Sequence, residues 1–182
     1  MGTIIITGVP GVGKTTVVTE AARLAGLPVV VYGSAMVELA RAQGLVRDRD
    51  EMRRLPSDVQ RRLQEAAAQA IAEQGRVIVD THATIQTPKG YLPGIPSWVA
   101  ERLSPEMIVI VEAPPEAIEA RRAFDATRKR DSDTEEAISA HQDLNRAAMM
   151  AVGVLTGATV LIVQNEEGQP GEAAAVIAAA LR

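Results

Sequence analysis

Short runs of consecutive apolar residues alternate with longer amphipathic stretches along this chain of 182 residues. The short runs are rich in Ile and Val, which favour β-strands, and the longer stretches have apolar residues at helical spacing. Strands that are apolar throughout are typical of a parallel sheet with helices on both faces. The pattern therefore predicts an α/β fold of three layers, with one sheet between two layers of helices.

Five apolar runs are predicted to form the sheet, and helices are predicted between them. The strands are expected at residues 3–7, 29–32, 76–80, 107–112 and 158–163. The helices are expected at residues 17–25, 33–43, 56–75, 114–124, 134–156 and 172–182, with Ser34 as an N-cap. Residues 81–98 carry five prolines and glycines and neither period, which predicts a long ordered loop. These elements fill the chain, so we expect one domain over residues 1–182, with residues 33–75 inserted between the second and third strands.

Composition narrows the classes of protein to consider. The chain has no cysteine, which excludes disulfides, thiolate catalysis and Cys-based metal sites. A net charge of −4 argues against a nucleic-acid-binding surface. No apolar run is long enough to cross a bilayer, and a strand begins directly after Met1-Gly2, so we expect neither a membrane span nor a signal peptide. A cytoplasmic protein is the expectation that follows.

A glycine-rich loop follows the first predicted strand and has the pattern G-x-x-x-x-G-K-[ST]. In this pattern, successive backbone N–H groups surround a phosphate at the positive end of the next helix. The lysine reaches the β- and γ-phosphates, and the hydroxyl that follows is a ligand of Mg²⁺. The predicted nucleotide-binding residues are Gly8, Val9, Pro10, Gly11, Val12, Gly13, Lys14, Thr15 and Thr16. The loop predicts a P-loop NTPase that binds a nucleotide with Mg²⁺.

Asp80 ends the third predicted strand. A carboxylate after an apolar strand is where a P-loop enzyme places the aspartate that holds Mg²⁺ directly or through water. We therefore predict Thr15 and Asp80 as the metal-binding residues. The alternative is an aspartate that only ends the strand in a turn.

Basic residues cluster near residues 121–130, with one more arginine on the next predicted helix. Phosphoryl transfer needs charge neutralisation and exclusion of water, and arginines on a segment that closes over the phosphate loop provide both. We predict a short lid at residues 124–133. The predicted catalytic residues are Lys14, Arg121, Arg128, Arg130 and Arg146. The alternative is a solvated surface loop of mixed charge.

Several separated motifs together resemble the archaeal adenylate kinases, the short-lid branch of the nucleoside monophosphate kinases. The motifs lie at residues 7–16, 48–53, 79–82, 87–92, 125–128, 141–146 and 153–160. The resemblance implies the reaction of ATP with AMP to give two ADP, with Mg²⁺, on a five-stranded parallel sheet. It also implies a homotrimer and arginines that clamp the transferred phosphoryl group.

The resemblance also implies an AMP pocket, which we place at the second helix and after the third strand. One arginine among Arg41, Arg49, Arg53 and Arg54 is expected there, and we choose Arg53. The predicted acceptor residues are Gly33, Ser34, Met36, Arg53, Thr81, His82 and Gln86. His82 could equally be a hydrogen-bonded scaffold residue.

Two other classes of function remain open from the sequence. A related kinase for another monophosphate or a small alcohol would share the loop and the lid. An ATP-dependent switch or assembly protein would lack an acceptor, yet residues 33–75 offer a place to build an acceptor site. A GTPase is disfavoured because the chain has no Asn-Lys-x-Asp run, to which residues 127–131 come nearest.

Overall fold

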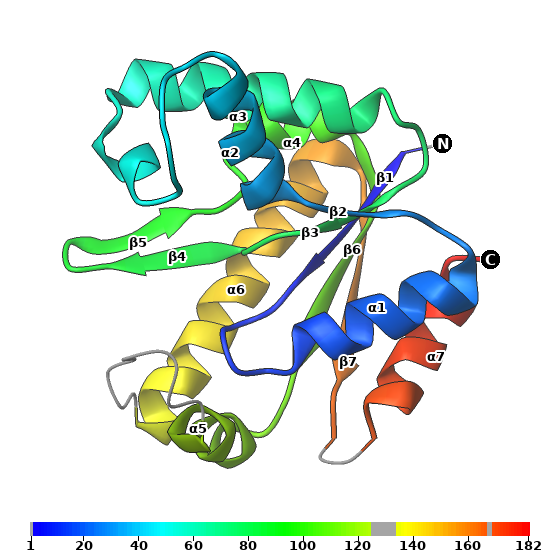
Figure 1. Ribbon diagram of the computed structural model, residues 1–182. Helices are drawn as coiled ribbons and strands as arrows, with labels where there is room; N and C mark the ends of the chain where they lie inside the picture. The colour runs from blue at the N-terminus through cyan, green and yellow to red at the C-terminus, as the bar shows by residue number, and fades with distance from the viewer. Residues whose placement is uncertain (1, 125–133, 167–168) are drawn as a thin grey trace.

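A sheet of five parallel strands crosses the middle of the structure in the order β2-β3-β1-β6-β7 (Figure 1). The computed structural model describes residues 2–124, 134–166 and 169–182. The strands are β1 (Thr3–Thr7), β2 (Val29–Val31), β3 (Ile78–Asp80), β6 (Pro105–Glu112) and β7 (Thr159–Gln164). Every pairing between neighbours is parallel. The predicted five-stranded parallel sheet is confirmed.

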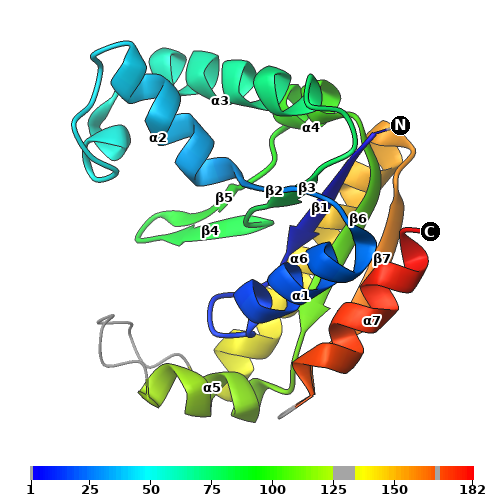
Figure 2. The same cartoon turned by 45° about the vertical axis from the view of Figure 1, so that its right-hand side comes forward.

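Helices cover both faces of this sheet (Figure 2). They are α1 (Lys14–Ala25), α2 (Tyr32–Ala42), α3 (Ser57–Ala72), α4 (Ser97–Leu103), α5 (Pro115–Phe124), α6 (Glu135–Thr156) and α7 (Pro170–Ala180). On one face, Ile4 and Ile6 of β1 pack with residues of α1 and α7 in one apolar core. On the other face, Ile5 of β1 packs with residues of α3, α4 and α6 in a second core. Alternate side chains of one strand thus serve two cores, as expected for a covered parallel sheet.

The second strand differs from the prediction of a strand covered on both faces. β2 lies at the edge of the sheet and pairs with β3 alone. Val29 and Val31 are exposed, at 38% and 44%. Tyr32, predicted as the end of this strand, is the first residue of α2 instead. The predicted N-cap Ser34 therefore lies inside the helix, whose N-cap is Val31. A run of valines is apolar in either place, so composition alone did not separate an edge strand from a central one.

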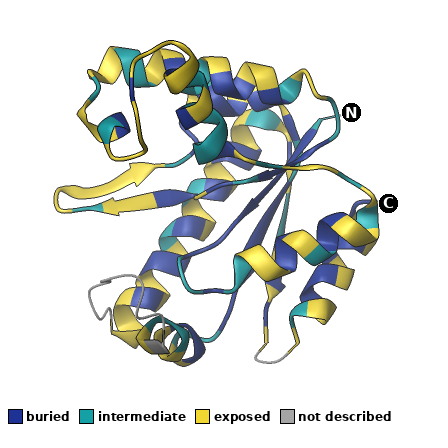
Figure 3. Ribbon diagram, in the orientation of Figure 1, coloured by how far each residue is buried: buried dark blue, intermediate teal, exposed yellow. Residues whose placement is uncertain are grey.

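Residues 81–98 do not form the predicted loop. They contain an antiparallel hairpin of β4 (Thr84–Thr87) and β5 (Gly90–Pro93), followed by the start of α4 at Ser97. The hairpin projects from the body of the structure, and much of its surface is exposed (Figure 3). Its base is held by Thr84, whose hydroxyl contacts His141 Nε2 at 2.9 Å and donates to Asn145 Oδ1 at 2.6 Å. The prediction was wrong because the Pro and Gly residues here lie in the turn and at the ends of two short strands. These strands show no alternation of buried and exposed residues that would identify them in the sequence.

The segment between β2 and β3 has a small core of its own. α2, the 3₁₀ turn at Glu51–Arg54 and α3 bury Val37, Met52 and Leu63 together. Figure 2 shows α2 and α3 on the side of the sheet where β2 is the edge strand, and the second half of α3 also packs into the core that contains Ile5. In the described ranges, none of the helices combines the length and apolar character needed to span a membrane.

Candidate active site

The loop of residues 8–13 leads from the end of β1 into α1 and lies between the hairpin and α5 in both views (Figures 1 and 2). Gly13 has a φ of 86°, in the left-handed region that favours glycine. A Cβ atom at Gly13 would lie 2.5 Å from Asn165 Nδ2, and one at Gly8 would lie 2.6 Å from the carbonyl oxygen of Val111. The loop therefore depends on glycine at both positions, and it delivers the chain to the first turn of α1.

Three side chains hold the carbonyl groups of this loop from outside. Arg121 Nη1 donates to the carbonyl oxygen of Val12 at 3.0 Å, and Asn165 Nδ2 donates to the same oxygen at 2.8 Å. Arg122 Nε donates to the carbonyl oxygen of Pro10 at 2.9 Å. A carbonyl fixed outward leaves neighbouring N–H groups to face inward, where they join the unpaired N–H groups of the first turn of α1. This arrangement is an anion site at a helix N-terminus.

Lys14, the first residue of α1, already has an anionic partner. Its Nζ forms an ion pair with Asp80 Oδ1 and donates to the carbonyl oxygen of Thr81 at 2.9 Å. Both charged side chains are largely buried, at 12% and 15% exposure. The parallel register explains the encounter, because Asp80 lies opposite Ile6 of β1, just before the loop. The structure thus brings two predicted site residues together, Lys14 and Asp80.

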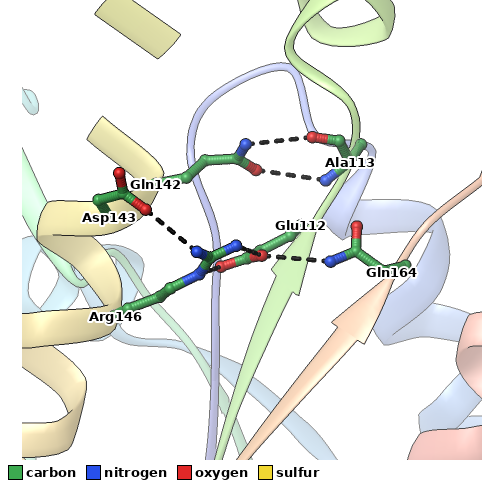
Figure 4. A network of polar contacts seen from close by, with 6 residues as sticks. All are labelled: Glu112, Ala113, Gln142, Asp143, Arg146 and Gln164. Atoms are coloured by element: carbon green, nitrogen blue, oxygen red, sulfur yellow. Dashed lines mark hydrogen bonds and ion pairs between the residues drawn. The ribbon is translucent and has the colours of Figure 1, made fainter. Parts of the chain in front are cut away.

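Arg146 on α6 is bound by a carboxylate at the end of β6 (Figure 4). Its Nε donates to Glu112 Oε1 at 2.7 Å and its Nη2 to Glu112 Oε2 at 2.5 Å. Arg146 Nη1 also donates to Asp143 Oδ1 at 3.1 Å. The hydrogen bond to Glu112 is the main cause of the raised pKa of Arg146, so the guanidinium stays charged. Glu112 is itself 2% exposed.

The predicted acceptor residues of α2 adjoin an arginine other than the chosen one. Arg49 Nη2 donates to Ser34 Oγ at 3.4 Å, and a Cβ atom at Gly33 would lie 3.2 Å from Arg49 Nη2. A hollow of about 380 Å³ is lined by Ser34, Val37, Glu38, Arg41 and Arg49. Arg53 is exposed and, within the described chain, is not part of this lining. Met36 packs against two apolar cores.

The predicted acceptor residues after β3 fall into two groups. Thr81 is buried and offers its carbonyl oxygen to Lys14, and His82, which follows it, is exposed. Partial loss of water around the ring, together with the charge of Lys14, lowers the pKa of His82 from its usual value, against the opposing charge of Asp80. His82 is therefore neutral at pH 7. Gln86 lies apart from them on the exposed hairpin, opposite Tyr91.

The remaining predicted residues are placed as follows. Thr15 and Thr16 are exposed on the first turn of α1, beyond the loop. Arg128 and Arg130 lie outside the described residues, as does nearly all of the predicted lid. Three contributors were not among the predicted site residues, namely Glu112, Arg122 and Asn165, and Arg49 was one of the four candidates from which Arg53 was chosen. Glu112 and Asn165 end or follow apolar strands, which is the same signal that singled out Asp80.

Comparison with solved structures agrees with this architecture. A shikimate kinase from Acinetobacter baumannii in complex with shikimate superposes with a TM-score of 0.62 over 97% of this chain and 90% of its own, at 17% identity. A gluconokinase from Sinorhizobium meliloti superposes with a TM-score of 0.53 over 99% of this chain and 93% of its own, at 16% identity. At these identities the likeness concerns the fold alone. Together with the phosphate loop, it defines an α/β P-loop NTPase fold of the type found in small kinases.

Comparison of sequences gives the family. A family model described as an AAA domain matches residues 7–139. Adenylate kinases from Methanopyrus kandleri, Thermoplasma acidophilum and Methanococcus aeolicus are 51%, 49% and 46% identical to this chain. The alignments cover 95%, 93% and 98% of this chain and 94%, 93% and 97% of the relatives. The chain belongs to the adenylate kinase family, as the motifs indicated.

The contact of Arg122 with the loop predicts a measurable effect without any nucleotide. Replacing Arg122 by Ala removes the donor to the Pro10 carbonyl, so the loop should open more often. Loss of one charge-assisted hydrogen bond of about 1.5 kcal/mol should speed amide hydrogen exchange in residues 8–13 by roughly tenfold. Arg23→Ala is the control, because Arg23 on α1 pairs with Glu20 at the surface and, among the described residues, does not contact the loop. Equal exchange in the two variants would show that Arg122 does not hold the loop.

Proposed function

We propose that this chain is an adenylate kinase that transfers the γ-phosphoryl group of MgATP to AMP and forms two molecules of ADP. The observation that carries this proposal is the second, arginine-lined hollow beside Ser34, in addition to the phosphate loop, in a member of the adenylate kinase family. A protein that only hydrolyses ATP needs the phosphate loop but no second site for a phosphate. ATP, AMP and ADP are then its small-molecule partners.

On the donor side, residues 8–16 hold the phosphates of ATP. The loop and the first turn of α1 supply N–H groups, and Lys14 supplies a positive charge. With ATP bound, Lys14 would contact the β- and γ-phosphates, and Asp80 would be one of the residues that hold the metal. Arg121 stabilises the loop through its hydrogen bond to the Val12 carbonyl oxygen, and in our proposal it also contacts a phosphate when the nucleotides are bound.

Mg²⁺ would be held by Thr15 and Asp80 together with the phosphates and water. In the described chain, no cluster of three or more His, Cys, Asp or Glu side chains could hold a metal ion alone. Mg²⁺ needs no such cluster, because it keeps several waters and takes one or two protein ligands beside the substrate phosphates. A hydroxyl on the first turn of α1 and a carboxylate paired to Lys14 fit this donor set. When bound, the ion neutralises charge on the β- and γ-phosphates.

On the acceptor side, AMP binds between α2 and the end of β3. Gly33, Ser34 and Arg49 would receive its phosphate, since Arg49 provides planar paired donors next to a hydroxyl. Neutral His82 and Thr81 would line the same space from β3. Met36, Arg53 and Gln86 belong to the wider surroundings of this pocket in our proposal.

Closure around the two nucleotides completes the proposal. Residues 33–75 act as the monophosphate-binding insertion and residues 124–133 as the short lid of a single kinase domain over residues 1–182. Arg128 and Arg130 would reach the transferred phosphoryl group from the lid, and Arg146 from α6. A protein with this activity and no membrane-spanning helix in its described ranges suits the cytoplasm, which we propose as its location.

Self-association, as a homotrimer, is the oligomeric state we propose. Met150, Val154 and Leu155 near the end of α6 are 55%, 81% and 50% exposed. Ile162 of β7 is 46% exposed and lies two residues from Val160, which packs on the α6 side of the sheet. A contiguous patch of exposed apolar side chains is a common mark of a protein interface, and we propose that these residues form such a patch.

A coupled assay with ATP and a panel of acceptors tests the activity. AMP should be turned over faster than CMP, UMP, GMP or dTMP, and Lys14→Ala should reduce turnover by at least a thousandfold while circular dichroism reports a folded protein. A greater rate with another monophosphate would refute the choice of acceptor. ATP hydrolysis that no acceptor stimulates would refute the kinase assignment.

The acceptor pocket is tested by comparing two arginines of the insertion. Arg49→Ala should raise the KM for AMP roughly tenfold or more, because a charge-assisted hydrogen bond contributes about 1.5–3 kcal/mol. The KM for ATP should change less than about twofold. Arg53→Ala is the matched control and should leave both values near those of the wild type. The reverse result would return the phosphate-binding role to Arg53.

The interface is tested by a charge on its most exposed member. Val154→Asp should convert a particle of three times the chain mass of 19.3 kDa into monomers, measured by light scattering after gel filtration. A charge buried at an apolar interface is costly, whereas the same charge in water is not. Val176→Asp on α7, where the valine is 51% exposed, is the control. A wild-type protein of one chain mass would contradict self-association.

A further inference from the structure

Glu112 is a buried carboxylate with an unusual set of partners. It ends β6 and is 2% exposed, so water cannot stabilise its charge. The two hydrogen bonds from Arg146 and a third from Gln164 Nε2 at 3.2 Å provide the compensation (Figure 4). Gln164 is opposite Glu112 in the register of β6 and β7, so the sheet itself brings them together.

Arg146 differs from Glu112 in being half exposed, at 46% of its side chain. A guanidinium has five N–H groups. Among the described residues, Glu112 accepts from two of them and Asp143 from one, so two are available for a ligand. The carboxylate thus fixes the plane of the guanidinium from the protein side without occupying all of its donors. An arginine held in this way loses little further freedom when it binds a phosphate, because its rotamer is already chosen.

A second contact fixes the helix that carries Arg146. Gln142 is one turn earlier on α6, and its side-chain amide pairs with the backbone of Ala113, the residue after Glu112. Gln142 Nε2 donates to the Ala113 carbonyl oxygen at 3.1 Å, and Gln142 Oε1 accepts from the Ala113 N–H at 3.2 Å. The contacts of Arg146 with Glu112 and of Gln142 with Ala113 therefore hold α6 against the carboxyl end of β6. The phosphate loop begins at the same end of the sheet, after β1.

We propose that Glu112 is a positioning residue for phosphoryl transfer, which holds the Arg146 guanidinium toward the transferred phosphoryl group. The inference rests on the proposed function, in which Arg146 contacts that group. The opposite arrangement has Glu112 withholding Arg146 from the nucleotides until it is released. The two arrangements predict changes of opposite sign when the charge of Glu112 is removed.

The test is the kinetics of Glu112→Gln, which removes the charge and keeps the shape. Positioning predicts that kcat falls about tenfold to a hundredfold, since a displacement of about 1 Å can have that effect, while the KM values for ATP and AMP change less than about threefold. The matched control is Glu106→Gln at the other end of β6. Glu106 also pairs with an arginine, because Arg76 Nε donates to it at 2.7 Å. This pair lies at the amino-terminal end of β6, whereas Glu112 lies at the carboxyl end. Its replacement should lower the melting temperature and leave kcat unchanged.

The double variant with Arg146→Ala identifies the route of the effect. If Glu112 acts through Arg146, Glu112→Gln should change the kcat of the Arg146→Ala protein by less than about twofold. An equal fall in both backgrounds, or an unchanged or higher kcat in Glu112→Gln alone, would overturn the proposal. Should Glu112→Gln fail to fold, Glu112→Asp keeps the charge but withdraws it by one methylene, and the same fall in kcat is expected. Wild-type protein without ATP and AMP turnover would instead refute the proposed function, so the two failures are distinguishable.

Discussion

The register of the parallel sheet is the constraint on which the rest of the site depends. Parallel strands end at one edge, and the residues at those ends come together however far apart they are in the sequence. Here Asp80 lies opposite Ile6, Ile110 opposite Thr7, and Gln164 opposite Glu112. A slip of one residue would turn each polar side chain toward the other face and place it inside an apolar core. The buried isoleucines of β1 therefore fix the register that places the polar residues at the carboxyl ends of the strands, in addition to stabilising the core.

The alignment of strand ends in a parallel sheet also explains which parts of the fold and the site could be predicted from the sequence. The phosphate loop and the parallel sheet follow from patterns that span a few residues, and Asp80 was singled out by a rule about strand ends, but the ion pair between Asp80 and Lys14 was not predicted. Arg121 was also predicted, although its contact with the Val12 carbonyl supports the loop in addition to any role with phosphate. These residues could be predicted because each belongs to a short local sequence pattern.

What sequence reasoning missed depends on contacts between distant elements. Arg49 rather than Arg53 meets Ser34, since the turn between α2 and α3 folds back in a way that no period encodes. Asn165 and Glu112 satisfied the strand-end rule, but only the order of the strands reveals that one faces the loop and the other an arginine. The hairpin was missed because most of its residues are exposed and so carry no pattern of burial.

The ion pair between Lys14 and Asp80 has a consequence for the energetics of ligand recognition. The lysine charge is already compensated, so in the proposed function an arriving polyphosphate would exchange one anionic partner of Lys14 for another. The net electrostatic gain from the lysine is then only the difference between the two, and the backbone N–H groups must provide much of the discrimination. In the proposed function, the ion pair therefore competes with incoming phosphates for Lys14, and this competition favours ligands that also engage the N–H groups of the loop.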